Sequence, residues 1–430
     1  MERRSRMKKP SMLVIFLTVF IDLVGFGIVV PLLPVYVEHF GAHGFVIGLI
    51  VASFSAMQFV FAPIWGRLSD RIGRRPVLLM STAGAAVSYV LFALSSGLAN
   101  HTAALWMMLV SRSLAGVCGG NITVAQAYMA DISTPEQRSR SMGLIGMAFG
   151  LGFILGPLIG LVSLKSLGIT GPGWVAAGFC AANFVLASFI LVESLQPSSE
   201  HVARRPHLHQ WLHTLRQPQI GLLICVFFLA TFCFSAFEST LALVVMANFQ
   251  LDTKAALSTA GYLFVFCGLI AALVQGGAIG QLVKRLGEAK LIALSLVLTA
   301  LCLCVLPFIK GSGPLSWHVL LRPEGVPWIW MLGALALLSV GTSLTRPPLF
   351  GLLSLLTPRH EQGETLGVAQ SAGSLARIPG PVFAASLLSY TPALPYLICG
   401  AIALLAGLYT WRALAKHQRA RVSAEKAQTA

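Results

Sequence analysis

The stretch Gly66-Arg67-Leu68-Ser69-Asp70-Arg71-Ile72-Gly73-Arg74-Arg75-Pro76 decides how this sequence is interpreted. It carries five charged residues within eleven positions and lies between two apolar runs, residues 45–65 and 77–97. Apolar runs of about 18 residues or more are long enough to cross a bilayer. A carboxylate at the edge of a membrane needs a cation or a helix N-terminus as its partner. The loop that carries Asp70 can supply both.

The composition of the chain is that of a helical membrane protein. Apolar residues make up 56% of the sequence and charged residues 10%, and the mean hydropathy is +0.80, whereas soluble domains carry roughly 25% charged residues. We predict an all-α polytopic membrane protein with twelve transmembrane helices and no sizeable soluble domain. The predicted spans are residues 11–37, 45–65, 77–97, 103–128, 141–163, 173–193, 219–247, 258–281, 290–309, 327–349, 364–389 and 391–411.

The net charge of +15 follows the membrane topology. Two of the thirty basic residues, Arg112 and Arg377, fall inside predicted spans. The odd-numbered connections hold four more, Lys165, Lys254, Lys310 and Arg322. The remaining twenty-four lie in the termini and the even-numbered connections, with Arg346 placed at the end of span 10. The positive-inside rule then puts both termini in the cytoplasm, and the basic balance does not indicate a nucleic-acid partner.

Neither end of the chain nor its cysteines change this interpretation. The first apolar run is longer than the h-region of a signal peptide and has no small-residue cleavage site, so we expect it to remain as span 1. All eight cysteines fall inside predicted helices as small buried residues.

The connection around residues 194–218 contains four histidines, which can bind metal, but we favour a solvated linker with an interfacial helix near Trp211. No metal site and no cofactor are predicted.

The two halves of the chain look like copies of one repeat. The pattern Gly66-x-Leu68-x-x-Arg71-x-Gly73 recurs as Gly280-x-Leu282-x-x-Arg285-x-Gly287, and Gly143, Gly156 and Pro157 recur as Gly367, Gly380 and Pro381. Lys284 stands where the second copy would place the acid. We predict a six-helix bundle over residues 1–193, a cytoplasmic linker over 194–218, a second six-helix bundle over 219–412 and a cytoplasmic tail over 413–430. A substrate site is expected between the bundles near the membrane midplane.

Charged side chains inside the spans are candidates for function, because each costs at least ~2.5–3.5 kcal/mol at the bilayer centre. Four residues meet this criterion: Asp22 in span 1, Arg112 in span 4, Glu238 in span 7 and Arg377 in span 11. Apolar burial favours the neutral form of a carboxyl group and a nearby arginine favours its charged form. We therefore predict that Asp22 and Arg112 couple transport to protons. The alternative is a static ion pair that locks span 1 to span 4.

The run Gly152-Phe153-Ile154-Leu155-Gly156-Pro157-Leu158-Ile159-Gly160 in span 5 repeats small residues at helical spacing. This spacing predicts close packing of span 5 against another backbone.

These motifs together resemble the drug:proton antiporters of the major facilitator superfamily, and the first half is similar to bacterial tetracycline-efflux carriers. The resemblance implies that Gly152, Gly156, Pro157 and Gly160 form the antiporter motif of span 5, although Leu161 replaces its final glycine. It also implies a cytoplasmic charge network that latches the two halves in the outward-facing state. The residues assigned to this gating network are Gly66, Asp70, Arg71, Gly73, Arg74, Arg75, Asp131 and Arg138. Because the second copy lacks the acid, we expect Asp70 to be the single strong latch.

The resemblance to tetracycline-efflux carriers does not extend to their substrate. Tetracycline carriers have acidic residues in spans 3 and 9 and a histidine in span 8, and this chain has none of them, so tetracycline itself is not the expected substrate. Polar and charged residues of the spans are expected to line a cavity for an amphipathic or cationic compound. They are Glu238, Arg377, Asn121, Gln126, Gln275 and Gln370.

We predict a secondary transporter that exports drugs or amphipathic molecules by proton antiport, as a monomer in the bacterial inner membrane. The chain has no P-loop, which argues against an ATP-driven pump, and no histidine in a span core, which argues against an intramembrane enzyme. The alternative function is a proton-coupled carrier for one specific metabolite, including an anionic one bound by Arg112 and Arg377.

Overall fold

The structure is a computed structural model that describes residues 10–29, 32–33, 36–37, 40–41, 45–195, 207–388 and 390–429. These residues form helices joined by short connections, and no strand occurs among them. Pro31 and Pro34 of the first predicted span lie outside the described residues.

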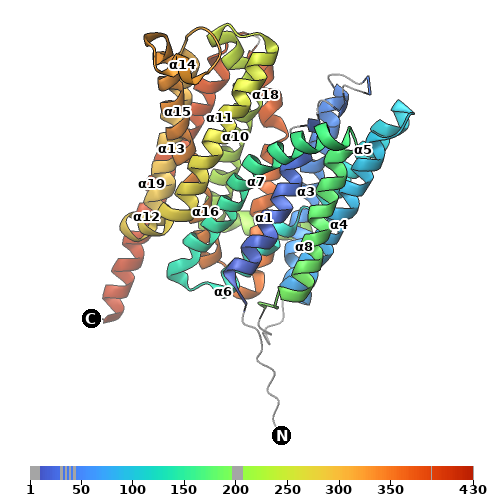
Figure 1. Cartoon of the computed structure of the whole chain (residues 1–430). Helices are drawn as coiled ribbons and strands as arrows, with labels where there is room; N and C mark the ends of the chain where they lie inside the picture. Colours follow the sequence, from blue (N-terminus) through green and yellow to red (C-terminus); the bar gives the residue numbers. More distant parts are fainter. Residues whose placement is uncertain are drawn as a thin grey trace.

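The first half of the chain is a bundle of long helices (Figure 1). Its helices are α1 (Met12–Val29), α3 (Phe45–Ile72), α4 (Arg74–Ser96), α5 (His101–Cys118), α6 (Asn121–Ile132), α7 (Arg138–Leu167) and α8 (Gly171–Ile190), with a short 3-10 turn, η2 (Pro135–Gln137), before α7. Within this bundle α1 packs along α7, α4 along α8, and α3 along α5.

The second half repeats this arrangement. Its helices are α10 (Pro218–Phe249), α11 (Thr253–Leu273), α12 (Ile279–Leu286), α13 (Glu288–Val305), α14 (Trp317–Leu320), α15 (Val326–Ser343), α16 (Arg346–Leu356), α17 (Gln362–Ala376), α18 (Pro379–Leu388) and α19 (Leu394–Thr429). Short 3-10 turns are η4 (Leu306–Phe308), η5 (Pro323–Gly325) and η6 (Arg359–Glu361), and a π-helical turn, η3 (Val274–Ala278), joins α11 to α12. The tail expected over residues 413–430 continues α19 as far as Thr429.

Three of the predicted spans are interrupted. Span 4 breaks at Gly119–Gly120, span 10 at Leu344–Thr345 and span 11 at Arg377–Ile378. Prolines explain the last two breaks, since the residue before a proline is disfavoured in a helix while proline itself fits the first helical turn. Eleven described helices are long and apolar enough to cross a membrane, and the remaining predicted span, span 11, consists of the two shorter pieces α17 and α18.

The expected position of Arg346 at the cytoplasmic end of span 10 was wrong. Pro347 and Pro348 occupy the first turn of α16, where the missing N–H groups cost nothing, so the helix resumes after the break. The apolar segment then continues from Pro323 to Leu356, and Arg346 lies inside it.

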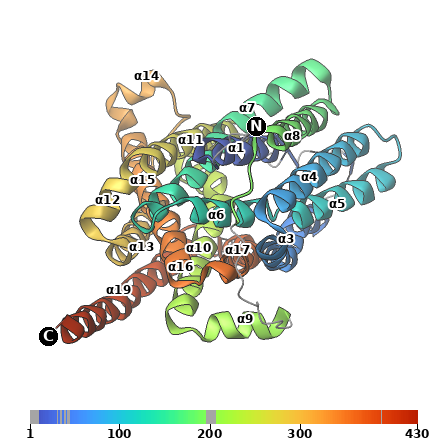
Figure 2. The ribbon, with the colours of Figure 1, turned by 90° about the horizontal axis from the view of Figure 1, so that it is seen from below.

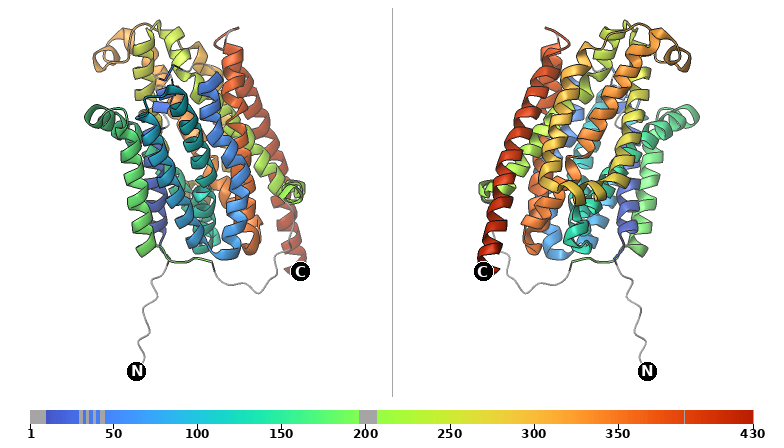
Figure 3. Two further views of the ribbon diagram at one scale, coloured as in Figure 1. Left: turned by 90° about the vertical axis from the view of Figure 1, so that its right-hand side faces the viewer. Right: turned by 90° about the vertical axis from the view of Figure 1, so that its left-hand side faces the viewer.

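The two halves meet along two main seams, α3 with α17 and α7 with α11, η3 and α16. Figure 2 shows α17 beside α3. We call the end of the bundle where α1 begins and α19 ends the terminal end (Figure 3). Close to this end, Gly66 and Gly363 bring the backbones of α3 and α17 into contact. At the other end α18 packs against α10 and α19, and the ribbons of the two halves diverge (Figure 1).

The connection between the halves contains the predicted interfacial helix. It is α9 (His207–Arg216), which lies at the edge of the bundle (Figure 2). The Trp211 ring packs on Phe59 of α3 with their centroids 5.5 Å apart. No group of three metal-ligating side chains occurs among the described residues, and His201 lies outside them.

Glycines bring α1 and α7 together as the span 5 spacing predicts. Side chains at Gly156 and Gly27 would each run into the backbone of the facing helix, and a Cβ at Gly152 would lie 3.0 Å from the Leu23 backbone. This contact fixes the position of Leu23 and hence of its neighbour Asp22.

Replacing Gly156 with alanine is expected to destabilise the bundle by about 1–3 kcal/mol, because the added methyl group overpacks the contact with Gly27. Gly178→Ala in α8 is the matched control, since a Cβ there meets nothing within 4 Å. Thermal unfolding of the purified variants would measure the difference. Equal melting temperatures of the two variants would contradict the packing argument.

Candidate functional site

The carboxylate of Asp22 is buried between four helices of the first half. Asn183 of α8 donates a hydrogen bond of 2.7 Å to Oδ1. Asn121, the first residue of α6, donates a short hydrogen bond to Oδ2, and the Thr82 hydroxyl of α4 lies 3.5 Å from the same oxygen. All three partners are neutral. They stabilise the carboxylate through dipoles that remain when the group is protonated.

Arg112 has different neighbours from those expected of an ion pair. Its guanidinium is buried over the rings of Tyr89 and Phe92, 5.3 and 5.2 Å from their centroids. Among the described residues it makes no ion pair, and its Nε and Nη2 atoms have no hydrogen-bond partner. Tyr89 interacts electrostatically with both Arg112 and Asp22. The static Asp22–Arg112 pair is therefore not the arrangement in this structure.

Asp70 joins the two halves at the terminal end. Its carboxylate accepts hydrogen bonds from the backbone N–H groups of Gly363 at 3.0 Å and Glu364 at 2.9 Å. These residues form the first turn of α17, so a carboxylate of the first half caps a helix of the second. Such a site favours an anion, because the helix dipole and unpaired N–H groups point toward it.

Arg74 ties this cap to the end of span 4. Its buried guanidinium lies 2.5 Å from Asp70 and 3.0 Å from Asp131, and it donates a further bond of 2.7 Å to Ser69. Ser194 donates a bond of 3.0 Å to Asp131. We call Asp70, Arg74, Asp131 and the first turn of α17 the latch.

Glu193 supports the latch from behind, a role that sequence analysis did not assign. Its carboxylate accepts bonds of 2.8 and 3.0 Å from the backbone N–H groups of Arg74 and Arg75, and thereby caps α4. Gly73 precedes this helix with a φ of 103°, and a Cβ there would run into the Glu193 carboxylate. Glycine is required by both the backbone angle and the close approach. Arg75 also donates a bond of 2.8 Å to the Ser188 carbonyl.

The other basic residues of the predicted network lie around the latch. Arg67 approaches Glu364 at 3.8 Å, and the exposed Arg71 interacts electrostatically with the same carboxylate. Arg138 crosses to the second half, where it donates to the carbonyl of Ser354 at 3.1 Å and to its hydroxyl at 2.6 Å.

The second copy of the loop reverses two charges of the first. The repeat offset aligns Asp70 with Lys284 and Arg74 with Glu288. Glu288 accepts a bond of 3.2 Å from Ser139 at the start of α7. The terminal end therefore has cross-half hydrogen bonds that involve Asp70, Arg138 and Glu288. Among the described residues, only Asp70 accepts hydrogen bonds from the backbone N–H groups of a helix of the other half.

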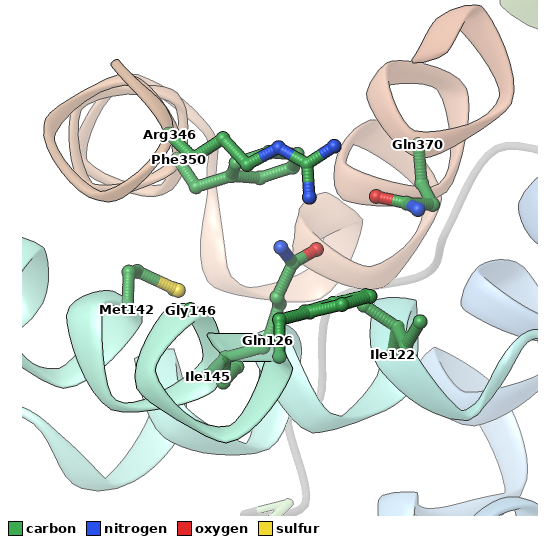
Figure 4. Close-up of a pocket in the computed structure, with 9 residues that line it drawn as sticks. Ile122, Gln126, Met142, Ile145, Gly146, Arg346, Phe350 and Gln370 are labelled. Carbon is green, nitrogen blue, oxygen red and sulfur yellow. The ribbon is translucent and has the colours of Figure 1, made fainter. Parts of the chain in front are cut away.

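A small pocket lies between the halves near the α15–α16 break. Gln126 and Phe149 line it from the first half, and Arg346, Phe350 and Gln370 from the second. The guanidinium of Arg346 points into the space between the two glutamine amides (Figure 4). The remaining residues that line the pocket are Ile122, Met142, Ile145 and Gly146.

The predicted cavity residues are divided between this pocket and its surroundings. Gln126 and Gln370 line the pocket, whereas Gln275 packs against Gly146 and Asn121 binds Asp22. Glu238 is exposed, and it interacts electrostatically with both Arg377 and Arg346.

Gln58 of α3 connects the breaks in two spans. Its Nε2 donates a bond of 3.1 Å to the Gly119 carbonyl at the break in span 4. Its Oε1 accepts a bond of 2.7 Å from Ser374, and Arg377 at the break in span 11 lies 3.4 Å away. Asn121, which binds Asp22, follows directly after Gly119 and Gly120. Gln58 therefore links the surroundings of Asp22 to Arg377 in the second half.

Sequence analysis missed Asn183, Glu193, Gln58 and Arg346. The consecutive Pro347 and Pro348 were a usable signal for a helix restart at Arg346. Asn183 and Gln58 had none, since a single amide in an apolar span does not reveal its partner.

Comparisons with known proteins agree with this architecture. The family model of the Major Facilitator Superfamily matches residues 15–322 and 325–430. The tetracycline resistance protein of class E from Escherichia coli is 32% identical over 382 residues, which cover 87% of this chain and 86% of that protein. Major facilitator superfamily domain-containing protein 10 from Homo sapiens is 30% identical over 429 residues, with 87% and 86% covered.

A solved structure has the same fold. The crystal structure of the human organic anion transporter MFSD10 (TETRAN) aligns with a TM-score of 0.75 at 26% identity and covers 93% of this chain and 98% of that one. The predicted twelve-helix architecture of two bundles and the resemblance to tetracycline-efflux proteins are thus confirmed. The chain belongs to the major facilitator superfamily.

Proposed function

We propose that this transporter exports amphipathic small molecules in exchange for protons by alternating access. The observation that carries the proposal is the buried Asp22 carboxyl, held only by neutral donors from three other helices. Such a group can be protonated without leaving an unpaired cation beside it. The second candidate, a proton-coupled carrier for one specific metabolite, uses the same machinery with a more selective cavity.

The latch supports the alternating part of the mechanism. It holds the terminal end closed, whereas the ribbons of the two halves diverge at the other end (Figure 1). We assign the terminal end to the cytoplasm because the basic residues concentrate in the connections there. With this assignment we propose an outward-facing state of a monomer in a bacterial inner membrane, with both termini cytoplasmic.

The cycle follows from these two sites. In the outward-facing state Asp22 takes a proton from the acidic side and the exported compound leaves the cavity. Separation of the latch exposes the cavity to the cytoplasm, where Asp22 loses its proton and a new substrate binds. Each proton contributes ~2.3 kcal/mol per 100 mV of membrane potential and ~1.36 kcal/mol per pH unit.

Asp22→Asn is expected to abolish substrate-dependent proton movement, because an amide side chain neither gains nor loses a proton near neutral pH. The measurement is the pH change inside proteoliposomes after addition of cationic, anionic or neutral amphipathic compounds. Asp252→Asn, at an exposed position before α11, is the control and should behave as the wild type. Unchanged coupled flux in Asp22→Asn would remove this residue from the proton role.

Gln58→Leu is expected to loosen the coupling between protons and substrate, because it removes the hydrogen bonds to Gly119 and Ser374. The ratio of protons to substrate molecules moved should fall, while substrate affinity changes little. Ser374→Ala, which removes only one of these bonds, should have a smaller effect. A proportional loss of both fluxes at a constant ratio would instead indicate a purely structural role.

A further inference from the structure

Arg346 is the cationic side chain that lines the pocket. Among the described residues it has no ion-pair partner. Its contacts are the faces of Phe149 and Phe227, whose ring centroids lie 5.6 and 5.4 Å from the guanidinium carbon. A guanidinium keeps its charge in proteins, and one that is partly withdrawn from water without an ion-pair partner favours an anion beside it. A transported molecule can supply the missing anion.

The charged groups around the pocket also favour an anion. Arg346 interacts electrostatically with Arg377 and with Glu238. These three groups carry two positive charges and one negative charge, so together they have a net positive charge. Asp22 does not compensate for it, because its hydrogen bonds are made to Asn121, Asn183 and Thr82 in the first half.

The groups beside the guanidinium complete a site for an anion on a flat apolar body. The amides of Gln126 and Gln370 flank it from opposite halves and can donate further hydrogen bonds (Figure 4). Phe149 and Phe350 provide aromatic surface next to these polar groups. The pocket is small, so its size suits the anionic group of a ligand.

We infer that Arg346 binds the carboxylate of transported aromatic acids, and that Gln126 and Gln370 hold the same group from the two halves. The inference rests on the proposed transport function and names the substrate class of that cavity. Residues of both halves line the site. A bound molecule is therefore in contact with both bundles when the transporter changes between its outward-facing and inward-facing states.

Equilibrium binding to the full chain in lipid nanodiscs tests this inference. The probes are naphthalene-2-carboxylate and naphthalene-2-carboxamide, which share their shape but differ in charge. A charge-assisted hydrogen-bonded pair predicts that the wild type binds the carboxylate roughly tenfold or more tightly than the amide. Arg346→Gln should lose this preference and keep its affinity for the amide. Arg346→Lys should retain part of the preference, since it keeps the charge without the planar fork.

Arg322→Gln is the matched control, because it removes an arginine that is exposed in the connection before α15. Its carboxylate preference should equal that of the wild type. The inference is overturned if the wild type binds both compounds equally, fails to bind the carboxylate at millimolar concentration, or if Arg346→Gln keeps the preference. Carboxylate binding that depends on Arg346 without any proton-driven transport would instead contradict the proposed function and leave the anion site in place.

Discussion

The contact between the Asp70 carboxylate and the first turn of α17 is the constraint on which the arrangement of the two halves depends. Two backbone N–H groups and one buried guanidinium satisfy this carboxylate. Hydrogen bonds to charged groups are worth ~1.5–3 kcal/mol each. The two bonds from the backbone N–H groups can form only while α3 and α17 are in contact, because these donors belong to the second half and Asp70 to the first. Their energy therefore favours one conformation of the transporter over the other.

The interior of the protein connects this contact to the candidate proton site. Asn121 binds Asp22 at the start of α6, and Gln58 spans from the preceding break to Ser374 in the second half. A change in how Asn121 holds Asp22 therefore acts on the same α3–α17 seam that the latch closes. The break at Gly119–Gly120 provides the backbone carbonyl that Gln58 binds, and Arg377 at the second break contributes its side chain. Irregular backbone of this kind is tolerated in a membrane only where it is buried in protein or lines a cavity.

Much of the fold could be predicted from the sequence because its signals are local or repeated. Apolar runs gave the spans, the glycine spacing of span 5 gave the packing on α1, and Gly66 to Pro76 indicated a held carboxylate. The interruptions at Arg346 and Arg377 were less accessible, since proline can either end a helix or begin the next one. The partners of Asp22 and Asp131 depend on tertiary contacts between distant residues. For that reason Arg112 was expected beside Asp22, whereas Asn183 and Asn121 bind it.

The most direct test of this account is the distance between the halves at the terminal end. Spin labels on genetically encoded residues at the exposed positions Ile72 of α3 and Leu355 of α16 would report it by pulsed electron resonance. The account predicts one short distance in the wild type and a substantial second, longer population in Asp70→Asn at the same pH and lipid composition. An identical distance distribution in the two proteins would contradict the claim that Asp70 holds the halves together.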